Sequence, residues 1–117
     1  MVIPLLENKA FVPNIEEILS VDGIDAVSFG PTDFALSLGL NLLYDFNHPK
    51  IVEAFEAVLV CAKRKNKPVL AAVNPPTVEQ SNALKEKGVQ FLLYGSDIGI
   101  IAGAFNRLMT DVVSKIK

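Results

Sequence analysis

Four short apolar runs recur along the chain, and each is followed by a polar turn and then by a segment with helical periodicity. The runs are nearly continuous in apolar character instead of alternating, which is typical of strands buried on both faces of a parallel sheet. They cover residues 2–6, 24–29, 69–73 and 91–94. The pattern predicts four βα units, joined by right-handed crossovers, with no linker or second domain between them.

Start and stop signals bound the helical segments. Asn14 is placed to cap a helix that begins at Ile15, and Pro49 suits the first turn of the next helix. Residues 77–80 fit a capping box, and Gly88 stands where a left-handed residue would close that helix. A last helix is expected to begin near residues 96–97. Its apolar residues recur at spacings of three and four, and they are Ile98, Ile101, Phe105, Leu108, Val112 and Ile116.

The length of 117 residues fits a single domain with one hydrophobic core. Four βα units are half the content of an eight-stranded (β/α)8 barrel, whose usual length is roughly 250 residues. An open four-stranded sheet would leave two edges to protect. We therefore expect an α/β half-barrel with a parallel sheet over residues 1–117, either as a fragment of a longer protein or as a naturally shortened one.

Composition and charge remove several classes of function. The formal net charge is −2, which gives no electrostatic footprint for nucleic acid or for an anionic membrane. No apolar run reaches the ~18 residues of a membrane span, and the N-terminus lacks the basic region of a signal peptide, so a cytoplasmic location is expected. Cys61 is the only cysteine, which excludes an internal disulfide, and its helical pattern favours a core position. A single histidine excludes zinc sites of the Cys/His type.

Candidate chemistry gathers where the predicted strands end. In parallel α/β folds the loops at the carboxyl ends of the strands form the functional face. Three of the four strands deliver a carboxylate there, and these are Glu7, Asp33 and Asp97. Glu7 and Asp33 follow the first two strands, with few basic residues near them in sequence. Two carboxylates so placed either repel each other or bind the same cation. Mg²⁺ and Mn²⁺ are suitable cations because both prefer oxygen ligands.

Each of these side chains also has a structural interpretation. Glu7 can be a solvated strand end, and Asp33 can cap a helix that begins at Phe34. Asp97 precedes a long amphipathic helix and is read as its N-cap, a role that Ser96 can share. His48 lies in the loop before a helix, where capping or surface exposure is favoured over acid–base work.

An ordered set of motifs resembles the metal-dependent pyruvate aldolases of the HpcH/HpaI type and the citrate lyase beta chain. The pattern is a strand that ends in Leu-Glu, a helix of the type N-x-E-E-I, then G-I-D, G-P-x-D-F and S-L-G, and it continues to Gly-Ser-Asp at 95–97. The positions that fit it before residue 40 are Glu7, Asn14, Glu17, Ile18, Gly23, Ile24, Asp25, Gly30, Pro31, Asp33, Phe34, Ser37, Leu38 and Gly39. The resemblance implies the C-terminal half of the barrel.

The resemblance also implies a function. Glu7 and Asp33 would hold a divalent ion that binds a 2-oxo acid, and the enolate formed on aldol cleavage would be stabilised by that charge. Residues Gly30, Pro31, Thr32 and Asp33 would form the substrate loop, with backbone N–H groups near Thr32 and Asp33 on the substrate carboxylate. The expected reaction cleaves 4-hydroxy-2-oxo acids to pyruvate and an aldehyde.

Two departures limit this expectation. Many aldolases of the family place Gln where this chain has Leu5, and their His base and substrate Arg come from the first half of the barrel. His48 matches a structural His-Pro position, so no catalytic acid or base is assigned in this chain. One alternative is a non-catalytic, self-associating half-barrel. Another is a small signalling or nucleotide-binding module, which the absence of a Gly-rich phosphate loop disfavours. The apolar last helix and the open sheet edges indicate a homo-oligomer.

Overall fold

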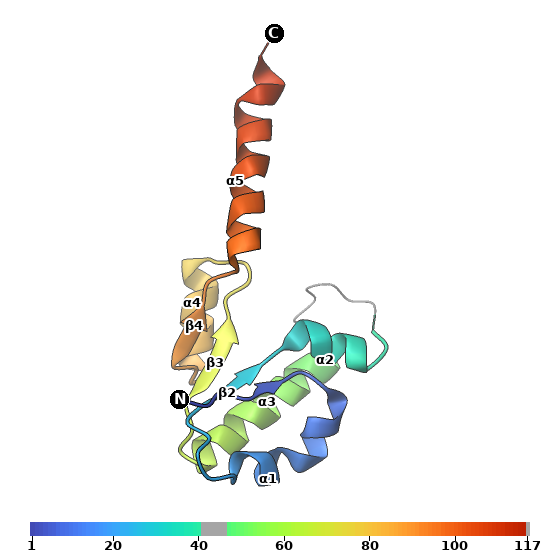
Figure 1. The fold of residues 1–117 in the computed structure, drawn as a ribbon, viewed down its shortest axis with the longest axis vertical. Coiled ribbons are helices and arrows are strands. Elements are labelled where there is room, and N and C mark those ends of the chain that lie inside the picture. The colour runs from blue at the N-terminus through green and yellow to red at the C-terminus, as the bar shows by residue number, and fades with distance from the viewer. Residues whose placement is uncertain (41–46, 117) are drawn as a thin grey trace.

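A parallel four-stranded sheet forms the centre of the computed structural model, which describes residues 1–40 and 47–116 (Figure 1). Its strands follow one another in the order β1-β2-β3-β4, as the repeated βα pattern predicts. They are β1 (Leu5–Leu6), β2 (Val27–Phe29), β3 (Val69–Ala72) and β4 (Phe91–Leu93). The strands are shorter than the apolar runs. In the first run, Pro4 has no N–H to donate to a neighbouring strand, so regular pairing begins only after it.

The helices occupy the segments that the sequence pattern predicts, with two differences. The last predicted helix ends as an α-helix at Asp111 and is followed by a short 3₁₀ helix. A 3₁₀ helix of six residues precedes the first α-helix and was not expected. In chain order the helices are η1 (Lys9–Asn14), α1 (Ile15–Leu19), α2 (Pro31–Ser37), α3 (Pro49–Arg64), α4 (Val78–Glu86), α5 (Asp97–Asp111) and η2 (Val113–Lys115). In the part of the chain that the structure describes, no helix combines the length and the apolar character needed to cross a membrane.

The glycine predicted to close α4 is confirmed, the capping box at its start forms only in half, and the cap predicted for α1 is absent. The Thr77 N–H donates to the Pro75 carbonyl at 2.8 Å and not to the Gln80 side chain. The Thr77 hydroxyl accepts a hydrogen bond of 3.2 Å from Gln80 N–H, and Gly88 has a φ of +94°. Asn14 makes no such cap for α1, and this prediction is wrong. Its side-chain amide donates instead to the Ala10 carbonyl at 2.8 Å, because η1 brings that carbonyl within reach.

The core lies between the sheet and the helices that cover it. The apolar runs predicted strands buried on both faces, and in the described chain this is wrong for β1 and β4: Leu6 is 4% exposed while its neighbour Leu5 is 52% exposed, and Leu93 is 51% exposed. Four phenylalanine rings contact one another in this core, with centroid separations of 5.4–6.0 Å, and they are Phe11, Phe29, Phe34 and Phe55. Only Phe29 and Phe55 are stacked, and the other pairs are edge-to-face or tilted. Phe34 belongs to α2, so this aromatic cluster fixes α2 against the end of β2.

Helix α5 projects away from the body of the chain (Figure 1). None of its residues is buried, and its apolar side chains stay open to solvent. Ile98 is 76% exposed and Phe105 is 63% exposed. The predicted helix is therefore present, but its apolar face has no partner among the residues that the structure describes.

Candidate functional site

The ends of β1 and β2 lie side by side at one edge of the sheet. Leu6 pairs with Phe29, and the Gly30 N–H donates a hydrogen bond of 3.0 Å to the Leu6 carbonyl. Parallel strands in this register present the residues that follow them at the same level. Glu7 and Gly30, the first residues after the two strands, therefore lie next to each other at the edge of the sheet.

The Glu7 side chain lies directly against Gly30. A β-carbon placed on Gly30 would stand 2.9 Å from Glu7 Cβ and 3.3 Å from Glu7 Oε2. Glu7 is only partly exposed, and among the described residues its carboxylate has no hydrogen bond or ion pair. Glu7, a partly exposed residue whose carboxylate has no partner in the described part of the chain, is therefore held at the start of α2.

Asp33 lies in the first turn of α2. The helix begins at Pro31 with Gly30 as its N-cap, so it starts three residues earlier than the alternative interpretation assumed. Asp33 is therefore not the residue that caps this helix, and that interpretation is wrong. Its side chain is exposed and, within the described residues, makes no hydrogen bond or ion pair.

A second connection ties the loop after β1 to α2. The Lys9 N–H donates to the Ser37 hydroxyl at 2.8 Å, and that hydroxyl donates in turn to the Phe34 carbonyl at 2.7 Å. Sequence reasoning included Ser37 only as part of a motif. Its contact with Lys9 joins residues 28 positions apart, and no local pattern signals such a bond.

The other candidate residues have structural roles. Ser96, not Asp97, is the N-cap of α5, and its hydroxyl accepts from Gly99 N–H at 3.2 Å. The Asp97 carboxylate accepts from the N–H of Ile98 at 2.8 Å. His48 caps α3, and its Nδ1 accepts from Lys50 N–H at 3.3 Å. The predicted capping role of His48 is thus confirmed. For α5 the N-cap is Ser96, so the role predicted for Asp97 belongs to the residue before it.

The donor atoms of Glu7 and Asp33 suit a hard cation but do not enclose one. Across residues 1–40 and 47–116, no three side chains of His, Cys, Asp or Glu gather as a ready metal site. Two carboxylates leave most coordination positions to water and substrate, which is how Mg²⁺ is usually held. The carboxylate oxygens of Glu7 and Asp33 are thus of the donor type that a hard divalent ion prefers.

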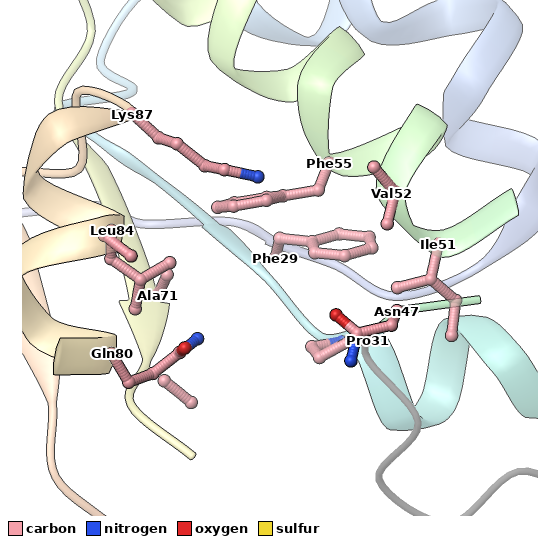
Figure 2. A pocket seen from close by; sticks show the side chains of 12 residues that line it. Phe29, Pro31, Asn47, Ile51, Val52, Phe55, Ala71, Gln80, Leu84 and Lys87 are labelled. Atoms are coloured by element: carbon pink, nitrogen blue, oxygen red, sulfur yellow. The ribbon is translucent and has the colours of Figure 1, made fainter. Parts of the chain in front are cut away.

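A separate pocket of about 210 Å³ lies between α3 and α4 (Figure 2). Its lining is mostly apolar and includes Phe29, Phe55 and Leu84, with the Lys87 side chain pointing toward the Phe55 ring. Within the described chain, neither Glu7 nor Asp33 lines this pocket. Pro31 does line it, so the pocket adjoins the first turn of α2, which also carries Asp33.

Comparisons with a family model and with curated proteins point to the same family. The family model described as HpcH/HpaI aldolase/citrate lyase matches residues 1–104. The 5-keto-4-deoxy-D-glucarate aldolase of Klebsiella pneumoniae is 31% identical over 103 residues, which are 88% of this chain and 39% of that protein. The hydroxypyruvate/pyruvate aldolase of Rhizorhabdus wittichii is 32% identical over 107 residues, 92% of this chain and 42% of that protein.

Solved structures share the fold. The HpcH/HpaI aldolase from Desulfitobacterium hafniense has a TM-score of 0.83 and 26% identity, and the match covers 100% of this chain and 44% of that chain. The citrate synthase SbnG has a TM-score of 0.86 at 23% identity, with 98% and 45% covered. The chain thus spans about two fifths of the length of the curated relatives that it matches.

Proposed function

Because the chain belongs to the HpcH/HpaI aldolase/citrate lyase family, we propose that it supplies the metal and oxo-acid site of a carbon–carbon lyase. The proposed substrates are 4-hydroxy-2-oxo acids, which aldol cleavage converts to pyruvate and an aldehyde. The names of the relatives support the aldolase class, since several are 5-keto-4-deoxy-D-glucarate aldolases and one is a hydroxypyruvate/pyruvate aldolase.

One observation carries this proposal. The pairing of β1 with β2 holds Glu7 against Gly30, the N-cap of the helix whose first turn carries Asp33. Neither carboxylate has a hydrogen bond or ion pair among the described residues, so both are available as ligands. Glu7 and Asp33 would hold Mg²⁺ or Mn²⁺, and such an ion would offset negative charge that develops on the keto oxygen of the substrate.

The residues predicted as a substrate loop form the N-cap and first turn of α2, and they have their own part in binding. In the first turn of α2, the N–H groups of Thr32 and Asp33 donate to no acceptor in the described chain. We assign them to the substrate carboxylate, which they would orient beside the two metal ligands. Pro31 precedes them and has no N–H, and its fixed φ sets the direction of the turn.

The described residues offer no evident general base at this site. His48, the only histidine, caps α3 through Nδ1. Proton transfer is therefore assigned to groups outside this chain, in the portion of the relatives that the chain does not span. Binding of the ion and the oxo acid is the part of the function that these residues would perform themselves.

Thermal unfolding with added ligands tests the binding step. Mn²⁺ or Mg²⁺ is expected to raise the melting temperature, and pyruvate or oxalate to raise it further, because a ligand that binds only the folded state stabilises it by about 2.7 kcal/mol at 100 times its Kd. The Glu7→Ala/Asp33→Ala variant is expected to lose both shifts. Glu53→Ala/Glu56→Ala, which removes two exposed carboxylates of α3, serves as the matched control.

Two results would contradict the proposal. The first is the absence of any metal-induced shift in the unchanged chain, and the second is an equal shift in the Glu7→Ala/Asp33→Ala variant. Pyruvate release from a 4-hydroxy-2-oxo acid tests the assignment of the base. Metal-dependent turnover by the 117-residue chain alone would show that this chain carries a base after all.

We also propose that the protein forms a homo-oligomer through α5. The apolar face of this helix is open, with Ile101 57% and Phe105 63% exposed, and such a surface in water favours association. A second copy presents the same surface, which makes self-association the simplest way to cover it.

A further inference from the structure

We propose that Gly30 and Ser37 are positioning residues, which together fix the place of the Glu7 carboxylate relative to α2. This inference rests on the proposed function, since it concerns how one of the two assigned metal ligands is held. It goes beyond that function because neither residue is assigned to bind the ion. Each acts on Glu7 through a different contact.

Gly30 acts by having no side chain. Its φ of −102° is open to any L-residue, so backbone conformation does not require glycine here. The requirement comes from space, because an added β-carbon would stand 2.9 Å from Glu7 Cβ. That neighbour is attached to the backbone at the end of β1 and is not the free end of a flexible side chain. An alanine at position 30 would therefore displace Glu7 itself.

Ser37 acts by hydrogen bonding. Its hydroxyl accepts the Lys9 N–H at 2.8 Å, while Gly30 N–H donates to the Leu6 carbonyl at 3.0 Å. These two bonds attach the chain to the β2–α2 unit on both sides of Glu7 and leave only Glu7 and Asn8 between the attachment points. Without Ser37, the hydrogen bond next to Glu7 on its C-terminal side would be lost, and the nearest remaining contact with α2 on that side would be the Phe11 ring, which packs against Phe34.

The unit that holds Glu7 is itself rigid. Phe34, whose carbonyl accepts from the Ser37 hydroxyl, is 2% exposed and packs against the rings of Phe11 and Phe29. Movement of α2 would open this aromatic cluster. Glu7 is therefore placed against the same helix that carries Asp33, and the separation of the two ligands depends on the contacts at Gly30 and Ser37.

Mn²⁺ affinity, measured by electron paramagnetic resonance on the 117-residue chain, tests this inference. Gly30→Ala and Ser37→Ala are each expected to weaken binding by about 10- to 100-fold, the range typical for residues that orient a metal ligand. Ser37→Thr keeps the hydroxyl and is expected to restore most of the affinity. In a Glu7→Ala background, Gly30→Ala and Ser37→Ala are expected to have no further effect, because the residue on which they act is gone.

Matched controls separate positioning from general damage. Gly103→Ala adds a β-carbon in α5, where the nearest atom is Arg107 Nη1 at 3.7 Å. Ser20→Ala removes a hydroxyl that bonds only the Glu16 carbonyl on its own helix. Both controls are expected to leave Mn²⁺ affinity unchanged. The melting temperature without metal is measured for every variant, so that loss of folding is seen separately.

The outcomes distinguish this inference from the proposed function. Failure of the unchanged chain to bind Mn²⁺ would overturn the proposed function. Binding by the unchanged chain, with equal binding by Gly30→Ala and Ser37→Ala, would overturn only the positioning roles. If Gly30→Ala does not fold, the comparison of Ser37→Ala with Ser37→Thr decides, and equal affinities for those two would overturn the inference.

Discussion

The Tyr94 hydroxyl donates a hydrogen bond of 2.9 Å to the Ser81 hydroxyl and so joins the segment after β4 to α4. Ser81 donates in turn to the Thr77 carbonyl at 2.6 Å. It is the one buried polar residue among those that the structure describes, with 8% of its surface exposed. The three groups form a short chain of hydrogen bonds along one side of α4.

Removing the Tyr94 hydroxyl tests that chain of bonds. Tyr94→Phe is expected to lower the free energy of unfolding by about 0.5–1.5 kcal/mol, the net value of one hydrogen bond, because Ser81 keeps its bond to Thr77. Urea denaturation measures the change. Tyr94→Phe in a Ser81→Ala background is expected to cost less, and an equal cost in both backgrounds would show that the two hydroxyls do not interact.

Truncation of Leu19 tests the core between α1 and its neighbours. Leu19 is 1% exposed, so Leu19→Ala is expected to lower the free energy of unfolding by about 2–5 kcal/mol through lost burial and a residual cavity. Leu36→Ala makes the same chemical change at a side chain that is 54% exposed, and a change within about 0.5 kcal/mol is expected there. Similar losses for both leucines would contradict the burial of Leu19 in the core.

Cys61 makes stability depend on alkaline pH. Burial raises the pKa of its thiol above the ordinary value of 9.0, and the Glu16 carboxylate raises it further. The folded state thus favours the neutral thiol, and this contribution is complete below pH 9.0 and is lost as the pH rises through the higher pKa of the folded state. The free energy of unfolding should therefore fall more steeply above pH 9.0 in the unchanged chain than in Cys61→Ala.

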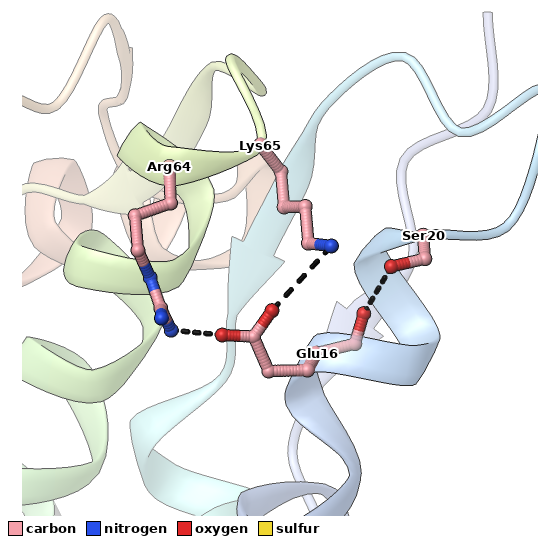
Figure 3. Close-up of polar contacts among 4 residues, drawn as sticks. All are labelled: Glu16, Ser20, Arg64 and Lys65. Carbon is pink, nitrogen blue, oxygen red and sulfur yellow. Dashed lines mark hydrogen bonds and ion pairs between the residues drawn. The ribbon is translucent and has the colours of Figure 1, made fainter.

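Glu16 provides a second check on this pH dependence. Its carboxylate forms ion pairs with Arg64 and with Lys65, the latter at 3.5 Å, while its backbone carbonyl accepts from Ser20 (Figure 3). Glu16→Gln removes the negative charge near Cys61 and should reduce the alkaline slope in part. An unchanged slope in both Glu16→Gln and Cys61→Ala would mean that other groups control the alkaline transition.

The open face of α5 gives a prediction for assembly. Phe105→Glu places a charge in the apolar face and is expected to shift the protein from oligomer to monomer in sedimentation velocity, because the charge would have to be buried at the interface. Asn106→Glu introduces the same residue at the next position of the helix, where the original side chain is already polar, and should leave the oligomer in place. A monodisperse monomer of the unchanged chain would contradict the proposed assembly.

Local signals in the sequence predicted the positions of the helices and strands well. They failed at a helix end where the capping side chain had a second hydrogen-bond partner within reach. Thr77 caps α4 as expected, because its hydroxyl reaches an amide only three residues ahead. Asn14 was expected to cap α1 in the same way. It turns back to Ala10, since the unexpected 3₁₀ helix brings the carbonyl of that residue within hydrogen-bond distance of the Asn14 amide.

The amino-acid sequence by itself determined the order of the βα units and put Glu7 and Asp33 at the ends of neighbouring strands, because apolar periodicity and turn residues act over a few positions. Only the tertiary structure decided that Glu7 rests on Gly30 and that Lys9 bonds to Ser37, since these contacts join residues 23 or more positions apart and depend on how β1 and α2 pack. It also decided that α5 leaves its apolar face open. Periodicity marks such a face, but the surface that covers it is set by packing with other elements.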